Sequence, residues 1–294
     1  MERGARRQLE HLLEQLARDE RLDQYADALQ NLVGEILPQG DMKDALTGGW
    51  LGHAVHPALT DAVIGTLASA TLLHLVGTRH ARRSSDFLVA AGLLAAVPTV
   101  ASGLADWVDS YGEEKRIGFI HAVGNGAGLA CYLLSFGPRL RGHGLRARAL
   151  RLCGFGLLAG AGYVGGHMTL RKGMGVDHGA FAAYPEHWTA VIQDEDLKEN
   201  ILTKVTAGGT DIVLYKNHRK IYALANTCSH AGGPLVEGQV DGDGCVSCPW
   251  HHSVFDLATG EVVHGPASSP QTVLEARRHE GAVEVRLHPP DGEH

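Results

Sequence analysis

The sequence predicts a protein of two unlike parts, an α-helical bundle that crosses a membrane four times and an all-β domain that follows it. Four apolar segments of 19–21 residues lie between positions 57 and 170, and about 20 helical residues are needed to cross the hydrocarbon core of a bilayer. After position 187 the apolar runs shorten and alternate with turn residues, as in strands. The net charge of −7 over 294 residues argues against a nucleic-acid-binding protein.

The N-terminal arm, residues 1–48, is acidic and carries apolar side chains at helical spacing between Leu9 and Ile36. This period predicts one or two amphipathic helices. Residues 1–30 lack the apolar core of a secretory signal peptide. The pattern leaves open whether the arm packs on the bundle or lies on the membrane surface.

The membrane domain is expected over residues 49–176. Its spans are predicted at 57–77, 87–105, 117–137 and 152–170, of which only the first contains a charged residue, Asp61. Small residues four apart let membrane helices approach closely. Such glycine pairs occur in the third and fourth spans, at Gly124 and Gly128, Gly156 and Gly160, and Gly162 and Gly166.

The orientation of the bundle is predicted from loop charge. The loops 78–86 and 138–151 hold eight arginines, opposed only by Asp86. Positively charged loops tend to remain in the cytoplasm. Both termini, and with them the β domain, are therefore expected on the non-cytoplasmic side.

Polar residues within the spans gather toward one interface. His56, Asp61, His121 and His167 fall within about 10 Å of the same membrane surface at 1.5 Å per helical residue. Ionisable groups within spans usually mark a site. Three interpretations remain open: polar residues that satisfy helix ends, a quinone or proton-handling site, and a haem b ligated by two of the histidines.

The β domain is predicted over residues 187–290, after a linker at 177–186. It contains two short motifs, Cys228-Ser-His230 and Cys248-Pro-Trp-His251. Zinc takes a ligand set of two Cys and two His, and so remains an alternative. Each motif, however, supplies one Cys and one His, which suits a two-iron cluster with thiolates on one iron and imidazoles on the other. Cys245 is expected to be a buried strand residue.

These motifs resemble the cluster loops of the Rieske [2Fe–2S] family. The similarity covers about 187–290 and extends to Gly265-Pro-Ala267, which resembles the loop that covers the cluster. It implies one [2Fe–2S] cluster per chain, with Cys228 and Cys248 on the inner iron. It likewise implies that His230 and His251 hold the outer iron. In quinol-oxidising members a disulfide joins the two loops; Gly233 and Trp250 stand at those positions here, so the loops are similar to those of the ferredoxin type.

The resemblance also bears on the reduction potential. High-potential members place a Ser and a Tyr hydroxyl near the cluster, and this chain has Ser253 and Phe255 at the matching places. Hydrogen bonds to the sulfurs are one determinant of the potential. With one donor of two, an intermediate or low potential is expected.

The membrane half resembles an uncharacterised four-span membrane family that is sometimes fused to Rieske domains. The motifs that carry the similarity are Gly52-His-x-x-His56-Pro, Gly103-x-x-Asp106-Trp and Gly165-Gly-His167. No chemistry is assigned to that family, so the resemblance implies topology alone.

The leading functional prediction is a membrane-anchored one-electron carrier. The alternatives are a quinol- or haem-linked oxidoreductase subunit and a redox sensor. A complete Rieske oxygenase is not expected, because only 43 residues follow His251. The expected partners are a redox donor and a redox acceptor, such as a basic soluble cytochrome or a reductase, together with membrane lipid and, in the alternative, quinone.

Overall fold

The computed structural model describes residues 2–37, 40–140 and 143–287. Arg141 of the basic loop and residues 288–290 of the predicted β domain therefore lie outside the described residues. The chain divides into two compact units, which we describe separately. The first comprises residues 1–39 and 55–174, and the second comprises residues 40–54 and 175–294.

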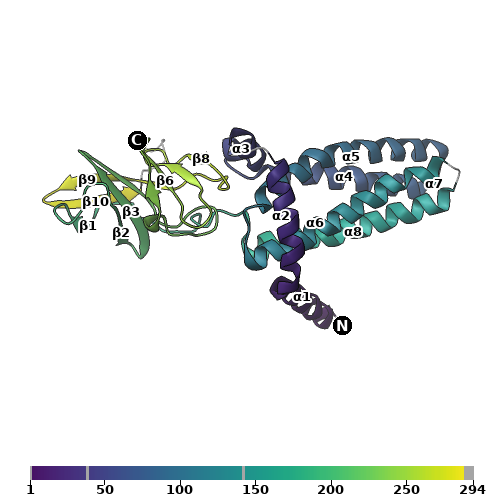
Figure 1. Ribbon diagram of the computed structural model, residues 1–294, viewed down its shortest axis with the longest axis horizontal. Helices are drawn as coiled ribbons and strands as arrows, with labels where there is room; N and C mark the ends of the chain where they lie inside the picture. Colours follow the sequence, from purple (N-terminus) through teal and green to yellow (C-terminus); the bar gives the residue numbers. More distant parts are fainter. Residues whose placement is uncertain (1, 38–39, 141–142, 288–294) are drawn as a thin grey trace. The chain divides into compact units, whose positions relative to one another are not determined.

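The helical unit begins with the N-terminal arm, which forms α1 (Glu2–Arg18) and α2 (Asp23–Ile36) (Figure 1). Both helices contact α6 (Gly112–Leu134). Arg116 at the start of α6 donates two hydrogen bonds to Asp23, at 2.9 and 2.7 Å. Gln30 donates from its side-chain amide to the carbonyls of Val108 and Ser110. The arm therefore packs on the helical unit, which answers the question that its amphipathic pattern left open.

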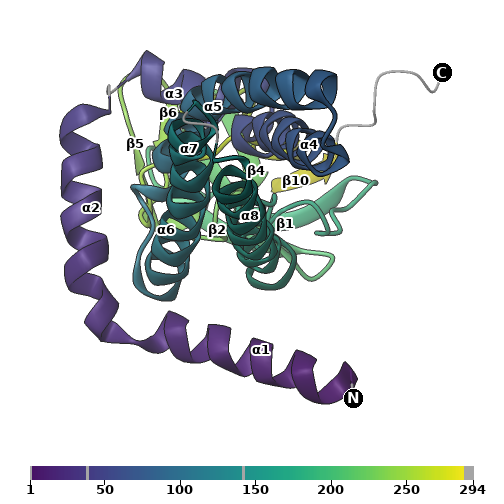
Figure 2. The ribbon, with the colours of Figure 1, turned by 90° about the vertical axis from the view of Figure 1, so that its right-hand side faces the viewer.

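Among the residues that the structure describes, four helices of this unit are long and apolar enough to cross a membrane. Three of them join α6 in the bundle, namely α4 (Val55–Val76), α5 (Arg79–Trp107) and α8 (Gly144–Lys172), with the short α7 (Phe136–Leu140) preceding α8. Figure 2 looks along the bundle, in which α4 packs on α5 and α6 packs on α8. Three of these helices, α5, α6 and α8, begin well before the predicted spans because the charged residues ahead of each apolar run are helical as well. Thr78, for example, caps α5 by accepting a hydrogen bond from the Ala81 amide.

The contact between α6 and α8 uses glycine, as predicted, but not all of the predicted glycines. A Cβ on Gly128 would lie 3.1 Å from the Gly154 carbonyl oxygen, and a Cβ on Gly124 would lie 3.1 Å from Ala161. On α8 the expected pairs 156/160 and 162/166 have nothing within 4 Å of such a Cβ. The prediction for α8 was therefore wrong in register, because Gly154 and Ala161 face α6 instead.

A buried arginine lies near the Arg-rich end of the bundle. Arg151 is fully buried, donates to Asp86 at 2.6 Å and to Ser135 at 3.1 Å, and lies 3.1 Å from Nδ1 of His74. Arg139 also lies 3.2 Å from Asp86. Arg139 and Arg151, which the sequence placed in a charged loop, are thus partly neutralised by Asp86.

In the described part of the second unit, the strands form two antiparallel sheets. The larger has the strand order β1-β10-β9-β4-β3-β2 and the smaller β5-β6-β7-β8. The strands of the larger sheet are β1 (Thr189–Gln193), β2 (Leu202–Ala207), β3 (Thr210–Asn217), β4 (Lys220–Ala225), β9 (Val273–His279) and β10 (Ala282–Leu287). Those of the smaller sheet are β5 (Gln239–Val240), β6 (Cys245–Ser247), β7 (Val254–Asp256) and β8 (Val262–His264). One apolar cluster draws on both sheets, through residues such as Val213, Leu224, Val246 and Phe255.

Two segments that the sequence placed outside the β domain pack within this unit. The predicted linker contacts the strands, since Pro185 accepts a hydrogen bond from the Leu287 amide at 2.6 Å. The segment 40–54, expected in the N-terminal arm and the first residues of the membrane domain, forms α3 (Asp41–Thr47) and the turn η2 (Gly49–Leu51). It contacts β8.

Candidate metal centre

The two motif-bearing loops have closely similar backbones. In the first, the Cys228 amide donates to the Gly233 carbonyl and the Gly232 amide donates back to the Cys228 carbonyl. In the second, the Cys248 amide donates to Ser253 and the His252 amide donates back to Cys248. Gly232 and His252 both have a positive φ, 79° and 59°. His252 is exposed, and its positive φ serves this tight turn.

The two loops bring their cysteines together. Cys228 and Cys248 are each 1% exposed, and their side chains hydrogen-bond to each other. Each sulfur also faces two backbone amides of its own loop, those of His230 and Ala231 around Cys228 and those of Trp250 and His251 around Cys248. Amide donors of this kind stabilise negative charge on sulfur.

This arrangement shifts the pKa values of the two thiols in opposite directions. The hydrogen bond from Cys228 lowers the pKa of Cys248, although burial opposes the shift. The same hydrogen bond, together with burial, raises the pKa of Cys228. The thiolate is the form of cysteine that binds metals.

The histidines of the two loops form a second pair. The ring centroids of His230 and His251 are 4.8 Å apart, with an interplanar angle of 83°. Both rings are half-buried, and the Trp250 ring beside His251 is exposed. Within the described ranges no three His, Cys, Asp or Glu side chains gather closely enough to hold one metal ion. The four donors are arranged as a thiol pair and an imidazole pair.

Gly233 lets the loops approach this closely. A Cβ on Gly233 would lie 2.9 Å from the Cys248 sulfur and 3.0 Å from Cγ of Trp250. Both distances are too short for a real Cβ to adopt without movement of the second loop. The two positions that hold cysteines in disulfide-bearing relatives, as the resemblance implies, are therefore packed directly against each other here as glycine and tryptophan.

Buried polar residues hold the two motif-bearing loops in place through hydrogen bonds. Ser253 is fully buried, and its hydroxyl oxygen accepts a hydrogen bond from the Ala267 amide at 3.0 Å. Gln271 accepts from the Ser229 amide and donates to the carbonyls of Ala225 and Thr227. Gln271 could not be singled out from the sequence, because a glutamine before a strand is ordinary. Only its burial in the fold distinguishes it.

Two neighbouring residues are buried, Cys245 as expected from the sequence and Phe255 as well. Cys245 is buried in β6, and burial raises the pKa of its thiol. Phe255 is fully buried in β7 and packs in the same apolar cluster as Cys228 and Cys248.

The donor set fits a Rieske-type [2Fe–2S] group. Such a group takes two thiolates on one iron and two imidazoles on the other. The paired thiols, the amides directed at them and the paired rings supply those donors from two adjacent loops.

The structure brings together two of the four polar residues predicted within the spans. His56 and His121 lie with ring centroids 6.4 Å apart at 82°. Asp61 is exposed on α4. His167 lies two residues beyond Gly165, whose Cβ would contact His121; two helical residues turn through about 200°, so His167 faces away from the pair.

The His56 and His121 rings are oriented by backbone carbonyls. Nδ1 of His56 lies 2.8 Å from the Thr99 oxygen, and Nδ1 of His121 lies 2.8 Å from the Ala161 oxygen. A carbonyl only accepts, so each Nδ1 carries the hydrogen. Asn125 lies 3.1 Å from Nε2 of His121 and donates to it.

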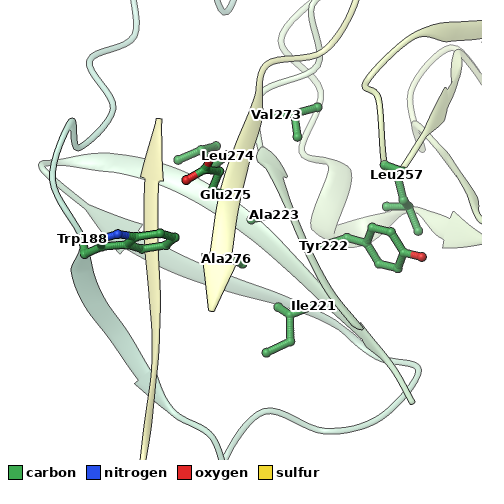
Figure 3. A pocket seen from close by; sticks show the side chains of 10 residues that line it. Trp188, Ile221, Tyr222, Ala223, Leu257, Val273, Leu274, Glu275 and Ala276 are labelled. Atoms are coloured by element: carbon green, nitrogen blue, oxygen red, sulfur yellow. The ribbon is translucent and has the colours of Figure 1, made fainter. Parts of the chain in front are cut away.

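A hollow of about 570 Å³ lies elsewhere in the second unit. Figure 3 shows Trp188 on one side of it and Tyr222 and Leu257 on the other. Arg277 and Arg286 lie over the Trp188 ring, 4.1 and 4.5 Å from its centroid. None of the four motif residues lines this hollow.

Comparisons with known proteins find a matching family for each half of the chain. Residues 187–278 match the Rieske [2Fe–2S] domain, and residues 52–178 match a predicted membrane protein domain, DUF2231. The chain is 31% identical to ferredoxin CarAc of Metapseudomonas resinovorans, over 33% of this chain and 92% of the relative. It is 36% identical to the anthranilate 1,2-dioxygenase ferredoxin subunit of Burkholderia cepacia, over 28% of this chain and 74% of the relative.

Among solved structures, one similar chain comes from the complex of reduced oxygenase and oxidized ferredoxin in carbazole 1,9a-dioxygenase. It is 29% identical, with 36% of this chain and 97% of that chain covered and a TM-score of 0.33.

Proposed function

Since the chain belongs to the Rieske [2Fe–2S] family through its C-terminal domain and carries DUF2231 ahead of it, we propose that it is a membrane-anchored one-electron carrier. One observation carries the proposal: two adjacent loops each supply one Cys and one His, arranged as a hydrogen-bonded thiol pair and a pair of packed rings. The four apolar helices support the membrane anchor.

In this proposal Cys228 and Cys248 hold the inner iron, and His230 and His251 hold the outer iron. The cluster, when bound, supplies a site that is reduced by one electron and reoxidised by one electron. The protein's residues do the rest: loop amides stabilise the thiolates, Gly233 keeps the loops in contact, and Ser253 offers a buried hydroxyl.

The partner is proposed to be a redox protein with a basic docking surface. Residues 187–294 carry 15 acidic and 8 basic side chains. Two relatives are named as ferredoxins of dioxygenase systems, which supports electron exchange with a reductase or an oxidised acceptor. Attraction between exposed charges is screened by salt, so docking should weaken as ionic strength rises.

The β domain is proposed to lie on the non-cytoplasmic side, as the arginine loops predict. Protease added to intact cells or spheroplasts should then cut within 171–187, producing a C-terminal fragment that antibody detects on a gel. Cutting only in inverted vesicles would place the domain in the cytoplasm and favour a cytoplasmic reductase as the partner.

The assignment is tested on the full chain purified without oxygen. About two irons per chain and the electron paramagnetic resonance signal of a reduced Rieske cluster are expected. One zinc and no iron would refute the proposal in favour of a structural zinc site.

A second candidate, a quinol- or haem-linked oxidoreductase subunit, is favoured by the His56–His121 pair. With hydrogen on Nδ1, a neutral His56 carries a lone pair on Nε2. That nitrogen suits either a quinol hydroxyl or a haem iron. Absorption bands of a b-type haem that are present in the native protein and lost in both His56→Ala and His121→Ala would support haem, whereas a native spectrum without them would refute it.

A further inference from the structure

The segment 40–54 contributes a carboxylate to the domain that carries the candidate metal centre. In α3, Oδ1 of Asp44 accepts a hydrogen bond from the Gly265 amide at 2.8 Å. Its other oxygen, Oδ2, lies 2.9 Å from Nδ1 of His264. Gly265 is more than 200 positions away from Asp44 in the sequence, so the contact is a tertiary one.

The fit between this segment and the end of β8 is close. Thr47 is 1% exposed. A Cβ on Gly265 would lie 3.2 Å from the Thr47 hydroxyl oxygen and 3.3 Å from Asp44. A Cβ on Gly49 would lie 3.6 Å from Val262. The segment therefore packs against residues 262–265 as well as accepting a hydrogen bond from them.

The loop that Asp44 holds also orients Ser253. Two residues after Gly265, the Ala267 amide donates to the Ser253 hydroxyl oxygen, and both Ala267 and Ser253 are fully buried. A hydroxyl has one hydrogen and two lone pairs. Because the Ala267 amide occupies a lone pair, the Ser253 hydrogen stays available to a second acceptor.

We propose that Asp44 is a positioning residue of the redox site, which holds residues 264–267 where Ala267 orients the Ser253 hydroxyl. This inference rests on the proposed function, since it assigns to Ser253 a hydrogen bond with a cluster sulfur. The N-terminal arm thereby takes part in setting the reduction potential.

The test compares two variants of the full chain, Asp44→Ala and Asp44→Asn. Both remove the negative charge, but only the asparagine keeps an oxygen that accepts from the Gly265 amide. The midpoint potential, followed by the electron paramagnetic resonance signal, should be lower in Asp44→Ala, because a loosened Ser253 stabilises the reduced state less. Equal potentials would overturn the inference.

A second comparison identifies the route of the effect. In a Ser253→Ala background the difference between Asp44→Ala and Asp44→Asn should vanish, since the effects of residues that act through one another are not additive. A difference that persists there would show that Asp44 does not act through Ser253. In Asp44→Ser the side chain is too short to place an oxygen at the Gly265 amide. Its midpoint potential should therefore equal that of Asp44→Ala, and it replaces Asp44→Ala in the test if Asp44→Ala folds poorly.

Controls separate this inference from the proposed function. Asp41 is an exposed carboxylate of the same helix. When Asp41→Asn is added to both Asp44 variants, the difference between their midpoint potentials should stay the same. Absence of iron from the native chain would refute the proposed function. Full iron content with no difference between the two Asp44 variants would refute only the role of Asp44.

Discussion

Each unit of the molecule holds a pair of histidines packed edge to face, with interplanar angles of 83° for His230 and His251 and 82° for His56 and His121. Their surroundings differ in polarity. Beside the first pair lie two buried sulfurs that face backbone amides. In the second pair each Nδ1 faces a backbone carbonyl.

The imidazoles are alike in the two pairs, but the backbone groups differ: amides face the sulfurs beside the first pair, and carbonyls face the rings of the second. Amide donors favour an anion at the acceptor, so the loops around Cys228 and Cys248 are suited to thiolates and hence to metal. A carbonyl that accepts from Nδ1 fixes one tautomer and leaves Nε2 as the second functional nitrogen. The bundle pair is therefore suited to neutral imidazoles.

The largest expected effect is a loss of iron that occurs when the candidate metal centre is changed but not when the His56–His121 pair is changed. Cys228→Ser removes one thiolate, and iron should fall from about two per chain to nearly none. His56→Ala should retain the iron, because His56 belongs to the helical unit. Iron analysis and the electron paramagnetic resonance signal provide the measurement. Iron that is lost equally from both variants would mean that the pairs are not independent.

The next effect concerns the contact between the two loops. Gly233→Ala places a Cβ 2.9 Å from the Cys248 sulfur, and overpacking of this kind costs about 1–3 kcal/mol. Iron occupancy should fall below that of Gly242→Ala, where a Cβ has nothing within 4 Å. Equal occupancy in the two variants would show that the loops move apart at little cost.

A third effect tests the buried hydroxyl behind the thiol pair. A hydrogen bond to a charged group contributes about 1.5–3 kcal/mol, and about 60 mV corresponds to 1.4 kcal/mol for one electron. Ser253→Ala should therefore lower the midpoint potential by roughly 60–130 mV, and Phe255→Tyr should raise it. Redox titration measures both, and two unchanged potentials would contradict this account.

The smallest expected effect concerns the bundle pair. Gly165→Ala places a Cβ 2.8 Å from the His121 ring, whereas a Cβ on Gly166 has nothing within 4 Å. Alanine gains helix propensity at both positions, so only the contact differs. Thermal unfolding in detergent should show Gly165→Ala less stable than Gly166→Ala by about 1 kcal/mol. Iron content should not change in either variant.

Features of the fold that depend on composition, above all the long apolar helices, were predicted from the sequence. Four apolar runs predicted four long helices, and these are present. The ends of the helices were missed, because Arg79 and the charged residues after it continue α5 outside the apolar run. The burial of Arg151 was also missed, since its partners Asp86 and Ser135 come from other segments.

The candidate metal centre was predicted from local spacing, since each loop carries its own Cys and His within a few residues. The groups that hold the loops in place are distant in sequence and were not predicted. Gln271 contacts Ser229, and Asp44 contacts Gly265. Pairing of this kind depends on the tertiary fold, which no local pattern encodes.

The segment 40–54 has a consequence for how freely the halves of this protein can be exchanged. A chain shortened to residues 177–294 would keep every strand but lose the carboxylate that receives the Gly265 amide. A change at Asp44, which precedes α4 in the sequence, must therefore suit Gly265, which follows α8, and a change at Gly265 must suit Asp44.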